Sequence, residues 1–212
     1  IATTKLTDLE GKPFVFFPLH IEPEMALQGL SPEYFFQQAA IASISRDLPV
    51  GITLAVKEAY GAIGRRPDNF YDQIAELKNV VLLDTWEIGL ECVLKSIAVA
   101  TICGSAGFEG AAHGKPVITF GAHNIYNILP HVLIVGRDGD LPELIQKATS
   151  EQIDHTNQKN DGKKMLAAME KISFDMRSFD YADQHGFEQE SLDDALDCLT
   201  RSISEFEALK QG

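Results

Sequence analysis

The chain has few cysteines, few basic side chains and no long apolar run. Its three cysteines, Cys92, Cys103 and Cys198, form no CxxC pair, which favours reduced thiols in a reducing compartment such as the cytoplasm. Lysine and arginine number 18 against 31 acidic residues, and the net charge of −13 argues against a general nucleic-acid surface. No apolar stretch reaches the roughly 20 residues of a membrane-spanning helix.

Several signatures of known chemistry are also missing from the sequence. No GxGxxG follows the first expected strand, so we expect no dinucleotide cofactor. There is no GxxxxGK[ST] for ATP phosphates, no GxSxG nucleophile elbow and no histidine–cysteine spacing for a metal. The sequence therefore predicts neither a metal site nor a bound cofactor.

The composition is otherwise that of an ordinary globular protein. Its 212 residues can bury a core, with 45% apolar and 23% charged side chains. We expect one domain over residues 1–150 and a helical C-terminal extension over residues 151–212, packed on that domain. Because the chain begins at Ile1 rather than methionine, we expect it to be a piece of a longer protein.

Apolar, β-branched runs alternate with amphipathic stretches along the first 150 residues. The runs predict strands at residues 13–17, 52–56, 79–83, 97–102, 117–120 and 132–135. The stretches predict helices at residues 31–46, 68–77, 86–95, 108–113 and 141–149, followed by a long amphipathic helix at 188–210. This alternation predicts the α/β class, with a Rossmann-like sheet of about six parallel strands and helices on both faces.

The stretch IAVATICGSAGFEGAAHGKPVITFG reads as strand, glycine turn, short helix and strand. Its turn lies where ligands of open α/β sheets bind and where free backbone N–H groups attract anions. The turn residues are Gly104, Ser105, Ala106 and Gly107. Glu109 follows one turn into the helix, where its carboxylate could reach a ribose hydroxyl. The alternative is a tight turn whose glycines serve packing only.

Two further loops follow the carboxyl ends of predicted strands. The first carries His20, Glu22 and Glu24, and the second begins with Lys57 and Glu58. Because the carboxyl ends of parallel strands lie along one edge, these loops would converge with the glycine turn on one crevice. The alternatives are a solvated loop with capping acids and a surface loop that begins at a lysine.

Three more side chains are candidates for ligand contacts. Arg65 lies in the loop of residues 59–67, which could cover a ligand or serve as a surface connection. His123 and Tyr126 lie in the loop that follows the strand at residues 117–120. A lone histidine is more often structural or exposed than functional.

Three blocks, in this order, resemble the capsule polysaccharide biosynthesis family. They are FFPLHIEPE at 16–24, LPVGITLAVKE at 48–58 and TICGSAGFEGAAHGKPVITFG at 101–121. The resemblance covers about residues 13–130 and implies the two-domain glycosyltransferase type B fold, GT-B. This chain would then be its nucleotide-sugar-binding C-terminal half. The last block also resembles nucleotide-sugar 2-epimerases, which share that fold.

The resemblance implies roles for several candidate residues. The turn of residues 104–107 would meet the donor phosphate, and Glu109 would bind the ribose. A catalytic base would come from the absent half, with Glu22 and Glu24 as the candidates inside this chain.

The sequence departs from the family within its second block. Lys57 and Glu58 match the start of the family's KEHP motif, but Ala59 and Tyr60 stand where the family has His-Pro. In related transferases that use CMP-activated sugars, that histidine contacts the donor phosphate. The side chains that could replace its positive charge are Lys57, Arg65 and His123.

The implied activity is transfer of a sugar from a CMP- or UDP-activated donor to a glycan or lipid-linked acceptor. The implied partners are the nucleotide sugar, the acceptor, the N-terminal domain of the same protein and membrane export machinery at the inner face of the membrane. The alternatives are a nucleotide-sugar 2-epimerase and a non-catalytic nucleotide- or glycan-binding domain. We expect this piece to fold alone but to be inactive without its other half.

Overall fold

Six parallel strands form one sheet in the computed structural model, which describes residues 3–150, 154–173 and 189–210. The strands are β1 (Phe14–Pro18), β2 (Thr53–Lys57), β3 (Val80–Leu82), β4 (Ala98–Thr101), β5 (Val117–Thr119) and β6 (Val132–Ile134). Their order, β3-β2-β1-β4-β5-β6, is that of the Rossmann fold. The predicted fold class is therefore confirmed, and all the strand pairings are parallel.

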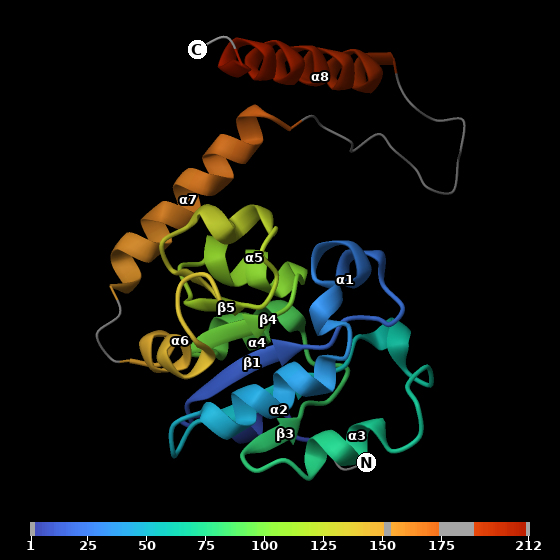
Figure 1. The fold of residues 1–212 in the computed structure, drawn as a ribbon, viewed down its shortest axis with the longest axis vertical. Helices are drawn as coiled ribbons and strands as arrows, with labels where there is room; N and C mark the ends of the chain where they lie inside the picture. Colours follow the sequence, from blue (N-terminus) through green and yellow to red (C-terminus); the bar gives the residue numbers. More distant parts are fainter. Residues whose placement is uncertain (1–2, 151–153, 174–188, 211–212) are drawn as a thin grey trace. The chain divides into compact units, whose positions relative to one another are not determined.

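Helices cover both faces of the sheet, as predicted (Figure 1). The helices of the described residues are α1 (Met25–Leu30), α2 (Gln37–Asp47), α3 (Phe70–Ala75), α4 (Gly89–Lys95), α5 (Ser105–Ala112), α6 (Leu141–Ala148), α7 (His155–Lys171) and α8 (Gln189–Lys210). The contacts place α2, α3 and α6 on one face of the sheet, and α4 and α5 on the other.

The strands are apolar on both faces because both faces are covered. Val15 and Phe17 belong to the core that also includes Ile41 and Ile44 of α2, and all four are fully buried. Phe16 points to the opposite face and is 1% exposed. Burial of each such side chain contributes about 1.5–3 kcal/mol, so the buried strands anchor the loops at their ends.

The helix predicted at residues 31–46 is interrupted. A 3-10 turn, η2 (Pro32–Tyr34), takes up its first residues, and α2 starts only at Gln37. Phe36 between them is extended, with φ −84° and ψ 90°, which is incompatible with a continuous helix. The short helix α1, before Ser31, was not predicted.

Several helix starts also differ from the prediction. Helix α3 begins at Phe70 rather than Asp68, with Asn69 as its N-cap residue. Helix α4 begins at Gly89 rather than Trp86, because Asp84 Oδ1 accepts a hydrogen bond from the Trp86 N–H and forms a turn there. Helix α5 begins at Ser105 rather than Phe108, so most of the predicted glycine turn lies inside the helix.

The chain divides into two compact units, Ile1–Lys163 and Lys164–Gly212, and each is described by itself. In the second unit, Cys198 is buried and its Sγ lies 2.9 Å from the carbonyl oxygen of Ile172. The predicted boundary at residue 150 and the packing of the extension stay predictions. No helix in the described part of the chain is both long and apolar enough to cross a membrane.

Candidate functional site

The order of the strands along the sheet changes direction between β1 and β4, and the loops after these two strands meet there. His20 follows β1, and its Nε2 lies 3.4 Å from the backbone nitrogen of Cys103, which follows β4. A Cβ built on Gly104 would lie 3.2 Å from His20 Cε1. We call this place the switch point; ligands of open α/β sheets bind at such positions.

Helix α5 starts at the switch point. Gly104 is its N-cap residue, with extended backbone, and Thr101 Oγ1 accepts a hydrogen bond from the Gly104 N–H at 3.1 Å. Ser105, the first helical residue, is exposed, whereas Ala106 and Gly107 are buried. The N–H groups of a first helical turn have no partner within the helix and form its positive end. The start of α5 can therefore hold an anion.

Tyr126 packs against this turn from within the protein. Its hydroxyl donates to the Gly104 carbonyl at 3.3 Å, and its side chain is buried. Burial raises the pKa of Tyr126, so the hydroxyl stays protonated. Gly107 leaves room for the ring, because a Cβ there would lie 2.5 Å from the Tyr126 hydroxyl. Gly107 thus has a packing role, and Tyr126 supports the turn from its buried side.

Glu109 lies four residues after Ser105 on α5, so both share one side of the helix. Because α5 starts at Ser105, Glu109 lies beyond its first turn, and that turn holds no acidic residue. The helix dipole therefore stabilises the Glu109 carboxylate less than it would stabilise an acid in the first turn. Burial raises the pKa of the Glu109 carboxyl, and nearby His113 lowers it in part.

Glu58 lies in a buried cluster rather than open to a ligand. It is 6% exposed, and its carboxylate accepts hydrogen bonds from the Ala59 N–H, the Arg66 guanidinium and the Tyr71 hydroxyl. Burial, followed by the bond to Glu58, raises the pKa of Tyr71 to about 12. Lys57, half-buried at the end of β2, donates from Nζ to the Glu58 carbonyl at 3.3 Å.

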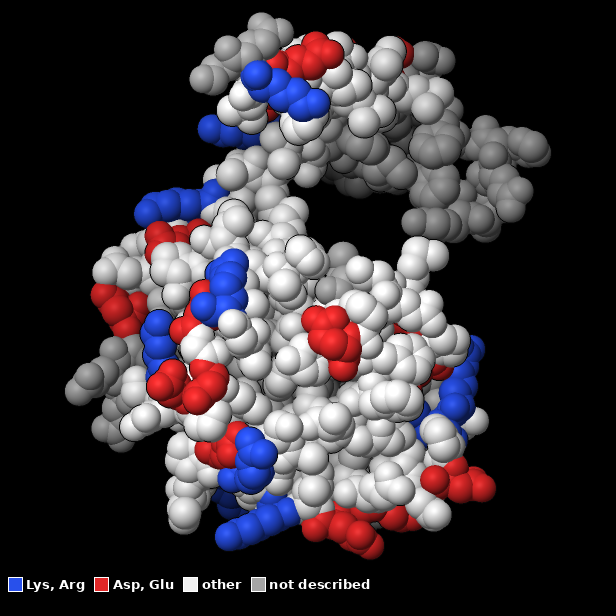
Figure 2. Space-filling view, viewed as in Figure 1, with Lys and Arg blue, Asp and Glu red and all other residues white. Residues whose placement is uncertain are grey.

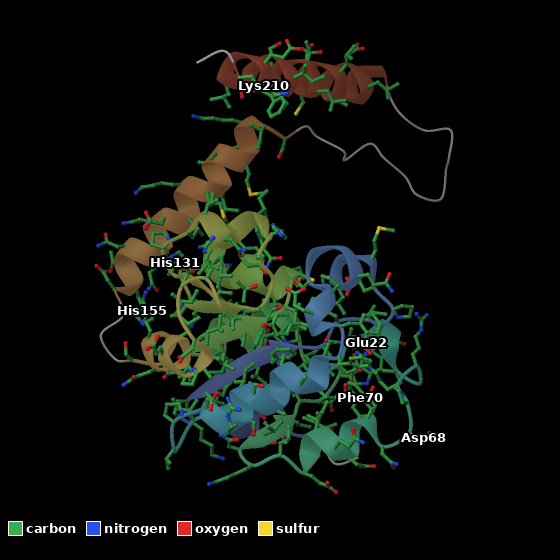
Figure 3. The ribbon with its side chains drawn as sticks, viewed as in Figure 1. Glu22, Asp68, Phe70, His131, His155 and Lys210 are labelled. Atoms are coloured by element: carbon green, nitrogen blue, oxygen red, sulfur yellow. The ribbon has the colours of Figure 1, made fainter. Side chains whose placement is uncertain are left out.

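The loop after β1 is held by several side-chain contacts. His20 Nδ1 lies 3.1 Å from a carboxylate oxygen of Glu24, whose side chain is 39% exposed. Glu22 Oε1 accepts from the Gln37 amide, and Glu22 Oε2 lies 3.4 Å from Arg66 Nη1. Burial lowers the pKa of His20, although Glu24 and Glu22 raise it in part. Figure 3 shows Glu22 beyond the end of β1.

The remaining predicted residues lie on the surface. Arg65 and His123 are both exposed. The sequence did not single out Gln37, Arg66 or Tyr71, which hydrogen-bond to the predicted residues His20, Glu22 and Glu58. Arg66 stood next to a candidate in the same loop, but neighbouring arginines give no signal of which one is buried.

A pair of exposed aromatic rings lies at the same edge of the sheet. Tyr60 follows β2 and Trp86 follows β3; their ring centroids are 4.9 Å apart, and they are 64% and 75% exposed. The Trp86 loop is fixed, because Asp84 Oδ1 accepts from the Trp86 N–H and Glu87 Oε1 accepts from the Leu6 N–H. Exposed aromatic rings on fixed loops can stack on a flat ligand ring.

A cavity of about 160 Å³ lies beside Glu58 and Tyr71, which both line it. Its lining residues are Thr3, Glu58, Ile63, Tyr71, Leu82, Leu83 and Thr85. In the view of Figure 2, lysine and arginine side chains of the lower part of the molecule lie mainly over its left-hand half and at its right-hand edge. Among the residues that the structure describes, no group of three His, Cys, Asp or Glu side chains is placed to hold a metal ion.

Neither the known protein families nor the curated proteins include a match to this chain. Among solved structures, it is similar to a UDP-GlcNAc 2-epimerase from Methanocaldococcus jannaschii, with a TM-score of 0.50 and 12% identity over 75% of this chain and 46% of that one. It is similar to the beta Kdo 2,4 transferase of KpsC from Thermosulfurimonas dismutans, with a TM-score of 0.44 and 22% identity over 65% of this chain and 44% of that one.

A third similar structure is the glycosyltransferase SnogD from Streptomyces nogalater, with a TM-score of 0.45 and 13% identity over 76% of this chain and 44% of that one. The chain spans less than half the length of each of these three structures. At such identities the likeness concerns the fold alone. The chain therefore has a Rossmann-like α/β fold of the kind found in a UDP-GlcNAc 2-epimerase.

Proposed function

We propose that this chain is the nucleotide-sugar-binding half of a GT-B glycosyltransferase of surface polysaccharide synthesis. The observation that carries the proposal is the start of α5 at the switch point, with His20 beside it and an exposed aromatic pair on the same edge. The resemblance of the three sequence blocks to the capsule polysaccharide biosynthesis family supports it, and the parallel Rossmann-like sheet is the fold that this family requires.

The donor phosphate binds at the first turn of α5. The backbone N–H groups of Ser105 and Ala106 and the Ser105 hydroxyl supply the hydrogen bonds. Lys57, at the end of β2, supplies a cation in place of the absent family histidine. Such contacts stabilise the phosphate as it leaves, which is the main contribution such a site makes to sugar transfer.

The nucleoside extends from this phosphate along the carboxyl edge of the sheet. Glu109 accepts a hydrogen bond from a ribose hydroxyl. The base stacks on Tyr60 or Trp86, a contact of about 1–3 kcal/mol. The ends of β4 and β2 are two strand spacings apart, about 10 Å, so one extended nucleotide can contact both places.

The acceptor, a glycan or lipid-linked sugar, binds mainly to a second domain of the same protein, which also supplies the catalytic base. Glu24 is the more accessible of the two loop acids, whereas Glu22 is bonded to Gln37 and faces Arg66. Of these two, Glu24 is therefore the better candidate for a base within this chain.

Calorimetric titration of the 212-residue chain with CMP, UDP and GDP tests the proposal, with inorganic phosphate as the control. We expect one pyrimidine nucleotide to bind clearly more tightly than phosphate alone. Equal affinity for phosphate and for all three nucleotides, or no binding of any nucleotide, would contradict the proposal.

An isomerase is the second candidate, favoured by the resemblance of residues 101–121 to nucleotide-sugar 2-epimerases. The fold is also that of a UDP-GlcNAc 2-epimerase, at a TM-score of 0.50. An epimerase needs no acceptor. Incubation of the full-length protein with a UDP-sugar alone, followed by analysis of the sugar product, distinguishes the two. Conversion of the sugar without an acceptor would assign the chain to the epimerases.

A further inference from the structure

Arg66 is buried beside the switch point and contacts three segments of the chain. Its side chain is 3% exposed. Nε and Nη2 donate to the two carboxylate oxygens of Glu58, at 2.6 and 2.9 Å. Nη2 also donates to the His20 carbonyl at 2.6 Å, and the guanidinium carbon lies 4.7 Å from the centre of the Phe70 ring. Figure 3 labels Glu22 and Phe70, which both lie against the Arg66 guanidinium.

The charge of Arg66 is already balanced within the protein. Glu58 pairs with it at 2.6 Å and Glu22 lies 3.4 Å from Nη1, so two carboxylates face one guanidinium. Arg66 is therefore not a free cation for a donor phosphate. Its contacts to other residues must account for any effect that it has on the site.

The backbone of His20 is held from two sides. Arg66 donates to its carbonyl, and Gln37 of α2, which is fully buried, contacts both its carbonyl and its N–H, at 3.0 and 2.7 Å. The imidazole then lies between Glu24, at 3.1 Å from Nδ1, and the Cys103 nitrogen, at 3.4 Å from Nε2. Because Nε2 faces an N–H donor, the neutral ring carries its proton on Nδ1.

We propose that Arg66 is a positioning residue of the nucleotide-sugar site: it holds His20 against the turn that opens α5, which keeps that turn arranged for the donor phosphate. This inference rests on the proposed function. The planar fork of the guanidinium is essential, because three donors in one plane reach Glu58 and His20 together. A lysine ammonium keeps the charge but cannot reproduce this geometry.

The test compares Arg66→Lys with Arg46→Lys. Arg46 also makes two hydrogen bonds to one carboxylate, that of Asp47, but its side chain is 70% exposed on α2. A second comparison, Tyr71→Phe, removes one bond to Glu58 without a direct contact to His20. The affinities for CMP and UDP are measured by calorimetry, and the tautomer of His20 by long-range ¹H–¹⁵N NMR.

We expect Arg66→Lys to weaken nucleotide binding by about tenfold or more and to remove the Nδ1–H signature of His20. Arg46→Lys and Tyr71→Phe should keep both, even where Tyr71→Phe lowers the melting temperature. A folded Arg66→Lys protein with unchanged affinity and an unchanged His20 spectrum would overturn the proposal.

A second variant covers the case in which Arg66→Lys does not fold. Arg66→Met combined with Glu58→Gln removes both buried charges together, and we expect it to fold with the same loss of nucleotide affinity. Wild-type affinity in this variant, or its failure to fold, would limit Arg66 to a role in stability. If the wild-type chain binds no nucleotide, the proposed function fails, whereas the His20 spectrum still tests the positioning of the ring.

Discussion

The hydroxyl of Tyr126 occupies the space that a side chain at Gly107 would need: a Cβ there would lie 2.5 Å from it. The Thr101 methyl would also be too close, at 2.7 Å. We therefore predict that Gly107→Ala lowers the free energy of unfolding by about 1–3 kcal/mol through overpacking. Denaturant unfolding measures this change.

Gly29→Ala is the matched control for that substitution. Gly29 also lies in a helix, α1, but a Cβ at this position would have nothing within 4 Å. Alanine there should leave stability unchanged or raise it by up to about 1 kcal/mol. Equal effects of the two substitutions would show that Tyr126 does not restrict position 107.

Lys57→Ala should weaken nucleotide binding by about 1.5–3 kcal/mol, the range for hydrogen bonds to charged groups. Calorimetry measures the effect. Lys12→Ala serves as the control, because Lys12 Nζ also donates to a backbone carbonyl, that of Asp8, but lies on an exposed turn before β1. Unchanged affinity in Lys57→Ala would exclude a contact between Lys57 and the donor phosphate.

Glu109→Gln should reduce the preference for ribonucleotides over 2′,3′-dideoxy analogues while leaving the melting temperature nearly unchanged. The reason is that the lost contact is to a ribose hydroxyl. If Glu109 only supported the helix, stability would drop by a few tenths to ~1 kcal/mol with the preference intact. Titration of the variant with both nucleotide forms, together with a thermal melt, separates these outcomes.

Stability should fall as the pH drops below about 6.5. Burial lowers the pKa of both His20 and His131, so the folded state binds fewer protons than the unfolded state in that range. Nearby Asp161 partly offsets the lowering of the His131 pKa. The raised pKa of Glu109 has the opposite effect: at lower pH it makes the folded state bind more protons than the unfolded state, which stabilises the folded state.

Denaturant unfolding at about pH 7.5 and about pH 5.5 measures this dependence. His131→Gln is the informative variant, because the glutamine amide can still donate to the Ala111 carbonyl that His131 Nε2 contacts. The loss of stability on acidification should be smaller in this variant. An identical loss would show that His131 does not contribute to it.

The sequence predicted the strands and their parallel pairing, because the apolar runs that form β1 and β5 are buried on both faces of the sheet. It also predicted the glycine after the C-terminus of α5, Gly114, which has a φ of +73°, but it placed the start of α5 three residues too late.

What the sequence could not predict depends on contacts between distant residues. Arg66 is 46 residues from His20, and no periodic pattern indicates that it contacts His20 while Arg65 is exposed. The start of α4 was predicted wrongly for a local reason, because a side-chain bond from Asp84 replaces the first helical turn at Trp86.

Tryptophan fluorescence tests most directly whether a nucleotide binds along the carboxyl edge of this sheet. Trp86 is the single tryptophan of the chain and lies on that edge, so its emission reports on this place alone. We predict a saturable change in emission with UDP or CMP, little change with inorganic phosphate, and a smaller change in Tyr60→Ala. Nucleotide binding detected by calorimetry without any change in Trp86 emission would contradict the proposed site.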